Sequence, residues 1–193
     1  EMFPTYIDAG AVEDMSSYVT DEDKKEYKYL SNGNMMDGQY GWPLVTGVPF
    51  VLYYNEDILN ALGEKAPETW DDFARICQEA TKDTDGDGKV DQYGFACGMN
   101  TSDIGAMQIL NAYYYSALWQ NGGQVYNDDL KSVSFADEAG KEAVTWLKGL
   151  TSYMNEDFMS LSWSDAFSNV FGAGKAAFGI TRSSQTDGTT FAE

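Results

Sequence analysis

Apolar residues recur along this chain with two different periods, which indicates strands separated by helices. The run Val48–Asn55 is rich in β-branched and aromatic residues, and this composition predicts a buried strand. Shorter apolar runs at Tyr93–Cys97 and Ala176–Ile180 predict two more strands. Because helical patterns lie between these runs, the sequence predicts an α/β domain with its ligand-facing loops at the ends of the strands.

The clearest helix is predicted to begin after Thr69, which forms a capping-box-like pair with Asp72. The apolar face of this helix consists of Phe73, Ile76, Cys77 and Ala80. Other helices are predicted over residues 4–10, 57–63, 104–120, 135–154 and 165–171, with Asp103 and Ser164 as caps of the third and the fifth. Trp70, Trp119 and Trp146 lie in these helical segments and are expected in the core.

The charge balance restricts what the chain can bind. The sequence holds 31 acidic and 12 basic residues, a formal net charge of −19. Such a surface repels phosphate backbones, which excludes nucleic acid as a partner. Anionic membranes and substrates are disfavoured for the same reason, although a local basic pocket could override the mean charge. A neutral ligand or a cation fits better.

Two further residue types narrow the chemistry. The absence of histidine excludes histidine-dependent catalytic triads and histidine-ligated metal centres. Cys77 and Cys97 are too few for a disulfide framework or a zinc site. Two buried thiols are the favoured interpretation, and a single Cys77–Cys97 bridge is the alternative. No stretch approaches the roughly 20 apolar residues that span a bilayer, so no transmembrane helix is predicted.

The acidic loop at residues 83–91 is the most specific local motif. Its carboxylates occupy positions 1, 3, 5 and 9 of an EF-hand-like calcium loop, with a glycine at position 6 and a carbonyl ligand at position 7. Calcium prefers about six to eight oxygen ligands, and alternate side chains of a tight loop converge on one point. The predicted ligands are Asp83, Asp85, Asp87, Lys89 and Asp91.

The loop departs from an EF-hand at position 12, where Gly94 replaces the bidentate glutamate and a strand replaces the second helix. The sequence therefore predicts a stand-alone, structural calcium that ties a helix end to the next strand. Any bidentate carboxylate must then come from elsewhere in the chain. The alternative is a solvated acidic turn, because Asp and Gly are common turn residues.

Five segments, taken in order, resemble the extracellular solute-binding proteins of the maltose-binding-protein type. These segments are Asp37–Pro43, Tyr53–Leu59, Pro67–Phe73, Leu118–Gly123 and Phe171–Phe178. The third resembles the family's helix start, P-x-T-W-x-E-h, in which h is an apolar residue. The acidic loop also recurs in members of this family.

The resemblance implies a type II periplasmic-binding-protein-like α/β fold, a three-layer lobe with a mixed sheet and flanking helices. It implies that residues 1–45 are the tail segment of a first lobe with the crossover, and that 46–193 are most of an incomplete second lobe. Two such lobes close on a sugar in the cleft between them. The protein would then be a monomeric carrier and not an enzyme, and it would deliver its ligand to the permease subunits of an ABC-type importer. Its location would be extracellular or periplasmic, either as a free protein or as a membrane-anchored lipoprotein.

The resemblance also indicates which segments line the cleft. They are residues 42–47, the loop after the strand 93–97, the start of the helix near Ser164 and the loop after Ile180. Sugar recognition needs aromatic faces for the CH-rich side of the ring and planar polar groups for the hydroxyls. The candidate ligand-binding residues are Trp42, Thr46, Asn100, Asp103, Trp163, Asp165, Arg182 and Ser183. The family's usual tryptophan after the last strand is replaced here by Thr181–Ser184, which favours a ligand unlike maltose.

Two other functions stay open from the sequence. Paired carboxylates with aromatic residues are also typical of a glycoside hydrolase, here a secreted and calcium-stabilised one. A carbohydrate-binding adhesion module would use the same residue types. Among 31 acids, however, chance pairs are abundant, and none lies in a recognisable catalytic context. No catalytic residue is therefore predicted, and carbohydrate binding for transport is favoured.

Overall fold

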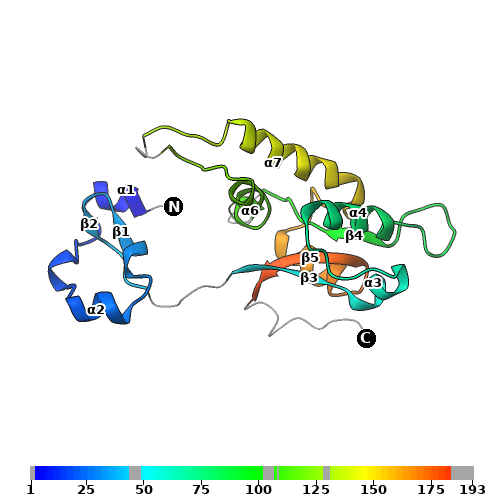
Figure 1. Cartoon of the computed structure of the whole chain (residues 1–193), viewed down its shortest axis with the longest axis horizontal. Coiled ribbons are helices and arrows are strands. Elements are labelled where there is room, and N and C mark those ends of the chain that lie inside the picture. The colour runs from blue at the N-terminus through cyan, green and yellow to red at the C-terminus, as the bar shows by residue number, and fades with distance from the viewer. Residues whose placement is uncertain (1–2, 44–48, 102–106, 108, 128–130, 184–193) are drawn as a thin grey trace. The chain divides into compact units, whose positions relative to one another are not determined.

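The chain of 193 residues divides into two compact units, Glu1–Val48 and Pro49–Glu193, in the computed structural model (Figure 1). The structure describes residues 3–43, 49–101, 107, 109–127 and 131–183. The cap predicted at Asp103 lies outside these residues. The predicted assignment of residues 1–45 to a first lobe and 46–193 to a second lobe stays a prediction.

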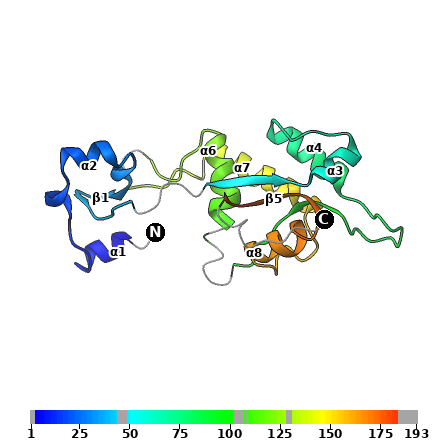
Figure 2. The same ribbon diagram turned by 90° about the horizontal axis from the view of Figure 1, so that it is seen from below.

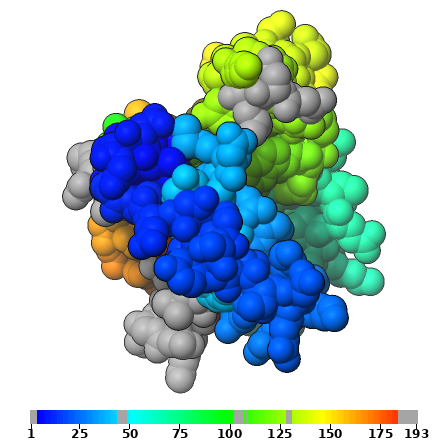
Figure 3. Space-filling view, turned by 90° about the vertical axis from the view of Figure 1, so that its left-hand side faces the viewer, coloured from blue at the N-terminus to red at the C-terminus, as the bar shows by residue number. Residues whose placement is uncertain are grey.

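The first unit consists of short elements held together by polar contacts. They are α1 (Phe3–Asp8), the 3₁₀ turns η1 (Ser16–Tyr18) and η2 (Leu30–Gly33), α2 (Asp21–Glu26), and the antiparallel strands β1 (Asn34–Met35) and β2 (Gly38–Gln39). The Gln39 side chain donates hydrogen bonds to the carbonyls of Leu30 and Gly41. Figure 3 shows one face of this unit in blue. Among its residues whose burial is described, only Leu30, Gly38 and Gln39 are buried. These residues therefore form no hydrophobic core of their own.

The second unit contains a mixed sheet of the three predicted strands, in the order β3-β5-β4. Strand β3 (Phe50–Tyr54) runs antiparallel to β5 (Ala176–Arg182), with Phe50 opposite Arg182. Strand β4 (Tyr93–Ala96) runs parallel to β5, with Phe95 opposite Phe178. The last strand in sequence thus lies at the centre of the sheet and contacts both of the others.

Helices cover both faces of this sheet, which gives the three-layer α/β arrangement that the family resemblance implies. The helical elements are α3 (Glu56–Leu62), α4 (Trp70–Ala80), the π-helical turn η3 (Leu110–Tyr114) with α6 (Tyr115–Gln120), α7 (Glu138–Gly149) with the 3₁₀ turn η4 (Leu150–Tyr153), and α8 (Trp163–Ala166) with the π-helical turn η5 (Phe167–Phe171). Figure 2 shows α8 on the opposite side of the sheet from α3 and α4. No helix in the described ranges is long and apolar enough to cross a membrane.

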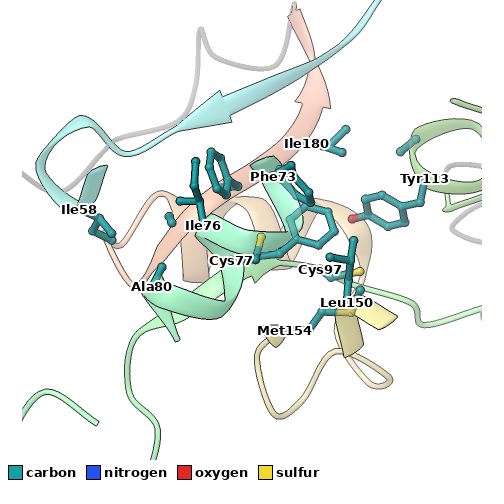
Figure 4. Packing of buried hydrophobic residues seen from close by; sticks show 14 of the residues in the cluster. Ile58, Phe73, Ile76, Cys77, Ala80, Cys97, Tyr113, Leu150, Met154 and Ile180 are labelled. Atoms are coloured by element: carbon teal, nitrogen blue, oxygen red, sulfur yellow. The ribbon is translucent and has the colours of Figure 1, made fainter. Parts of the chain in front are cut away.

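The larger core lies between the sheet and α4, whose predicted apolar face is buried in full (Figure 4). The ring of Phe73 packs on Phe95 from β4 at 5.5 Å and on Phe178 from β5 at 4.8 Å, measured between centroids. Burying a side chain of this size stabilises the fold by about 1.5–3 kcal/mol. Because Phe73 contacts two neighbouring strands, α4 fixes their packing as well as its own.

The smaller core lies on the other face, under η5. Phe167 and Phe171 stack at 5.1 Å and pack against Tyr53 from β3. Gly179 of β5 makes this approach possible, since an added Cβ would lie 2.9 Å from Phe171 and 3.0 Å from Phe167. A glycine in the middle of a central strand is therefore a packing requirement here.

The two cysteines are free, buried thiols, which agrees with the favoured interpretation of the sequence. Burial raises the pKa of Cys97 to about 12, and it raises the pKa of Cys77 even further. Both side chains lie in the larger core, Cys77 on α4 itself and Cys97 just after β4 (Figure 4). They behave as small apolar residues, not as reactive groups.

Two predictions about the helices were wrong. The N-cap of α8 is Ser162 and not Ser164, so the helix begins at Trp163. The spacing Ser162-x-x-Asp165 was the available signal, because an acidic side chain three residues after the N-cap can accept a hydrogen bond from the cap residue. Trp119 is 56% exposed, although a core position was predicted. Helix α6 buries Ala117 and Leu118 instead, and this leaves Trp119 at the surface.

Candidate ligand-binding edge of the sheet

Strands β4 and β5 are parallel, so their carboxyl ends meet at one edge of the sheet. Solutes bind outside the carboxyl ends of the strands in open α/β sheets. Five predicted site residues of the second unit lie at or next to this edge, and they are called the strand-end edge below: Asn100, Trp163, Asp165, Arg182 and Ser183.

The loop after β4 is fixed against the start of α8. A Cβ on Gly98 would collide with the carbonyl of Ser162, so only glycine permits this close approach. The N–H of Asn100 donates to the carbonyl of Leu161 at 3.0 Å, and its side-chain amide donates to that of Ser160 at 2.9 Å. Asn100 is therefore held beside α8 by its backbone and its side chain together.

Asp165 has a structural role at the first turn of α8. Its N–H donates to the Ser162 hydroxyl at 3.1 Å, and that hydroxyl donates to the Asp165 carboxylate at 2.6 Å. This reciprocal pair forms a cap at the helix start. The carboxylate is exposed to solvent and stays accessible at the edge.

Trp163 lies beneath the edge as a core residue. It is 5% exposed, and its indole N–H donates to the carbonyl of Ile180 in β5 at 3.0 Å. Its ring meets Phe50 edge-to-face, with centroids 5.6 Å apart. In this unit the ring thus supports the edge, and its direct contact with a ligand stays a prediction.

Arg182 closes β5 and lies over these two rings. Its guanidinium carbon is 5.7 Å from the centroid of Phe50 and 6.0 Å from that of Trp163. The next residue, Ser183, donates its N–H to the carbonyl of Pro49 at 3.0 Å. Sequence reasoning missed Phe50, because no local pattern shows which residue lies opposite Arg182 in the sheet.

The remaining predicted residues lie elsewhere. Trp42 belongs to the first unit, where it is 37% exposed and meets the ring of Tyr27 edge-on at 5.4 Å. Thr46 and Asp103 lie outside the described residues. The structure therefore brings together the second unit's described candidates, and it tests neither their contact with a ligand nor the part of Trp42.

The acidic loop brings three of its carboxylates together. One oxygen each from Asp83, Asp85 and Asp91 lie within 4.8 Å of one another. Asp83 also accepts the N–H groups of Gly86 and Gly88 at 2.6 Å and 2.7 Å, and these hydrogen bonds lower the pKa of its carboxyl group. Both glycines adopt positive φ, which an L-residue rarely does.

The fourth carboxylate of the loop, Asp87, lies apart from the other three, and a hollow lies beside the loop. The carboxylate of Asp87 accepts the N–H of Lys89 at 2.8 Å and is not one of the three that converge. A hollow of about 640 Å³ beside the loop is also lined by Glu156 and Asp157. Burial, with Glu156 as the next contributor, raises the pKa of Tyr93 in the same hollow. Two acids from a distant segment therefore lie near the loop.

Comparison with known proteins shows to which family this chain is similar. The family described as "Bacterial extracellular solute-binding protein" matches residues 1–192. The chain belongs to this family. A protein of Brucella abortus (strain 2308) described as a binding protein is 28% identical over 189 residues, which cover 91% of the chain and 41% of that protein. The chain thus spans less than half the length of this relative.

Solved structures of binding proteins show the same fold at lower identity. An ABC transporter solute-binding protein from Thermotoga lettingae, bound with α-D-tagatose, gives a TM-score of 0.68 at 19% identity, and the match covers 92% of this chain and 44% of that one. The maltose/maltodextrin-binding domain MalE from Bdellovibrio bacteriovorus, bound to maltotriose, gives 0.66 at 16% identity, with 92% and 43% covered. These similarities confirm the type II fold.

Membership in the solute-binding family confirms the resemblance that the five sequence segments carry. Members of the family are binding proteins and not enzymes, which disfavours the glycoside hydrolase alternative. In the solute-binding family this chain corresponds to part of a longer protein.

Proposed function

We propose that the full-length protein binds a carbohydrate outside the cytoplasmic membrane and delivers it to an ABC-type importer. The observation that carries this proposal is the match of residues 1–192 to the extracellular solute-binding family. Proteins with the same fold are described as bound with α-D-tagatose and maltotriose, which supports a sugar as the solute. The protein would act as a monomer in the periplasm or at the outer cell surface, as a lipoprotein, with the importer's permease subunits as its partner.

The strand-end edge offers the groups that such a ligand needs. The carboxamide of Asn100, the hydroxyl of Ser183 and the exposed carboxylate of Asp165 can bind sugar hydroxyls as donors and acceptors. The ring of Trp163 holds the floor of this edge in place. By the resemblance, a first lobe would close over the bound solute and exclude water. Trp42 and Thr46, at the predicted crossover between the lobes, stay predicted ligand contacts.

Isothermal titration calorimetry of the full-length protein tests this function. A panel of monosaccharides, oligosaccharides, polyols, amino acids and short peptides is titrated, and a saturable heat with at least one carbohydrate is expected. A reducing-end assay on the same oligosaccharides separates binding from hydrolysis. Released reducing ends would support a hydrolase, and saturable binding of amino acids or peptides alone would replace carbohydrate as the solute.

We further propose that the acidic loop binds one structural calcium ion. The residues fit the metal, because the donors are oxygen atoms and three carboxylates already converge. Asp83, Asp85 and Asp91 would hold the ion together with Asp87 and the Lys89 carbonyl. Glu156 and Asp157, which face the same hollow, are the candidates for the carboxylate that Gly94 cannot supply. A bound cation would offset the mutual repulsion of these carboxylates and tie α4 to β4.

A further inference from the structure

A buried asparagine lies behind the loop that leads from β4 to the strand-end edge. Asn155 comes two residues after η4, and 1% of its surface is exposed. Burial of a carboxamide is unfavourable unless its polar atoms are hydrogen-bonded, so an asparagine in the interior needs fixed partners. The partners of Asn155 therefore show what its side chain holds in place.

These partners join the end of β4 to the segment after η4. The side-chain oxygen of Asn155 accepts the N–H of Cys97, the residue that follows β4, at 2.8 Å. Its amide nitrogen donates to the carboxylate of Asp157 at 2.7 Å. Just before this point, Phe95 of β4 and Met154 form a parallel bridge. The carboxamide thus takes the place of a backbone acceptor and extends this pairing beyond the end of the strand.

The same segment then reaches the edge itself. Residues 155–161 offer two backbone carbonyls to the loop after β4. The carbonyl of Phe158 accepts the N–H of Met99 at 2.6 Å, and that of Leu161 accepts the N–H of Asn100 at 3.0 Å. The loop is therefore joined to this segment as far as Asn100, which is a predicted ligand contact.

The contact at Cys97 differs from the other two. It is made by a side chain, so a substitution can remove it, whereas Met99 and Asn100 use backbone carbonyls as acceptors. It also lies in the interior, because Cys97 is fully buried. Without the carboxamide, the N–H of Cys97 would lose this partner inside the core, and the loop would be held less firmly.

We propose that Asn155 is a positioning residue for solute binding. Its carboxamide fixes the end of β4, and the loop that follows then presents Asn100 at the strand-end edge in the orientation that the solute requires. This inference rests on the proposed function and adds to it a residue that acts without touching the solute.

Hydrogen exchange of the full-length protein without solute tests the first half of this role, at a temperature where every variant is folded. Asn155→Leu removes both hydrogen bonds, and the amides of residues 97–100 are expected to exchange about tenfold faster, with smaller changes in α4. The matched control is Gln92→Leu at the other end of β4, which removes a side-chain hydrogen bond of 2.7 Å to the carbonyl of Ala80. In this control, exchange of residues 97–100 should change less than about twofold.

A reciprocal replacement separates a specific role from a loss of packing. Asn155→Asp places a carboxylate against that of Asp157, and the repulsion is expected to speed exchange in the loop. In the double variant Asn155→Asp/Asp157→Asn, the new carboxylate accepts the N–H of Cys97 and an N–H of the new amide, so slow exchange returns. Asp157→Asn alone is the control, because its oxygen still accepts from Asn155. These variants decide the question even where Asn155→Leu does not fold.

Calorimetry of the same full-length variants tests the second half of the role. The probes are α-D-tagatose, maltotriose and the other carbohydrates of the panel described above. Asn155→Leu and Asn155→Asp are expected to weaken binding about tenfold, whereas the double variant and Gln92→Leu should stay within about twofold of the parent protein.

The outcomes separate this inference from the proposed function. Unchanged exchange or unchanged affinity in the single Asn155 variants, no recovery in the double variant, or an equal loss of affinity in Gln92→Leu would overturn the positioning role and leave the proposed function intact. If the parent protein binds no carbohydrate, the proposed function is overturned, whereas the exchange measurement still decides whether Asn155 holds the loop.

Discussion

At the scale of single residues, Trp163 shows how one side chain serves the core and the edge together. Its ring is buried between Phe50 and β5, and its polar atom is satisfied by the carbonyl of Ile180. A buried indole N–H needs such a partner, and here the partner belongs to the central strand. The residue therefore links the start of α8 to the end of β5.

Replacing Trp163 by phenylalanine removes this link while keeping an aromatic ring. We expect Trp163→Phe to lower the free energy of unfolding by about 1–3 kcal/mol, because the Ile180 carbonyl loses its buried donor. Urea unfolding followed by circular dichroism measures the effect. The matched control is Trp119→Phe at the exposed tryptophan, where a change within about 0.5 kcal/mol is expected. Equal effects in the two variants would contradict this role for Trp163.

At the scale of elements, the capping box of α4 depends on a charged side chain. The Thr69 hydroxyl donates to the Asp72 carboxylate at 2.7 Å and accepts the Asp72 N–H at 3.0 Å. The first of these hydrogen bonds is the main reason why the pKa of Asp72 is lowered. The charged form of Asp72 thus stabilises the folded helix.

The sign of this effect predicts a pH dependence. A carboxyl group with a lowered pKa in the folded state contributes its full stabilisation above the unfolded value of about 3.9, and loses it as the pH falls through the folded value. We expect Asp72→Asn to be less stable than the parent protein at pH 7, with a difference that shrinks below about pH 4. Urea unfolding from pH 7 to pH 2 measures it. A difference that stays constant over this range would exclude the charge as its source.

The proposed calcium in the acidic loop gives a second prediction for an element. Removing calcium with EGTA is expected to lower the melting temperature, and added calcium is expected to restore it. At a calcium concentration 100 times the dissociation constant, binding would contribute about 2.7 kcal/mol. The effect should disappear in Asp85→Asn and persist in Glu26→Gln, which changes an exposed acid far along the chain. An unchanged melt across the series would leave the loop as a solvated acidic turn.

At the scale of the whole molecule, the strand-end edge is one side of a proposed two-sided site. The chain covers 41% of its Brucella relative and 43–44% of the two carbohydrate-bound structures. At a concentration of 100 times its dissociation constant, a ligand raises the stability of the full-length protein by about 2.7 kcal/mol. We therefore expect the same ligand to stabilise residues 1–193 alone far less. Thermal unfolding of both proteins with the same ligand series measures this. An equal shift in both would show that this chain contains the complete site.

How much could be predicted follows from how local each signal is. The strands, helix α4 with its buried face and the spacing of the acidic loop could be read from the sequence, because periodicity and capping act over a few residues. The contacts among Phe50, Trp163 and Arg182 could not be predicted in this way. Phe50 and Trp163 are more than a hundred positions apart along the chain, so no local pattern connects them. The N-cap of α8 was misplaced because Ser162 and Ser164 are only two residues apart and serine favours the N-cap at either position.

The sequence alone determined the order of strands and helices, the acidic charge and the family resemblance, because these depend on residue type and short-range spacing. The tertiary structure decided that β5 lies between β3 and β4, and hence which residues meet at the strand-end edge. It also decided that Trp163 is buried while Trp119 is exposed. The reason is that a local pattern shows which residues of a helix are apolar, but not which of them will be buried. That depends on which distant segments pack against the helix in the folded protein.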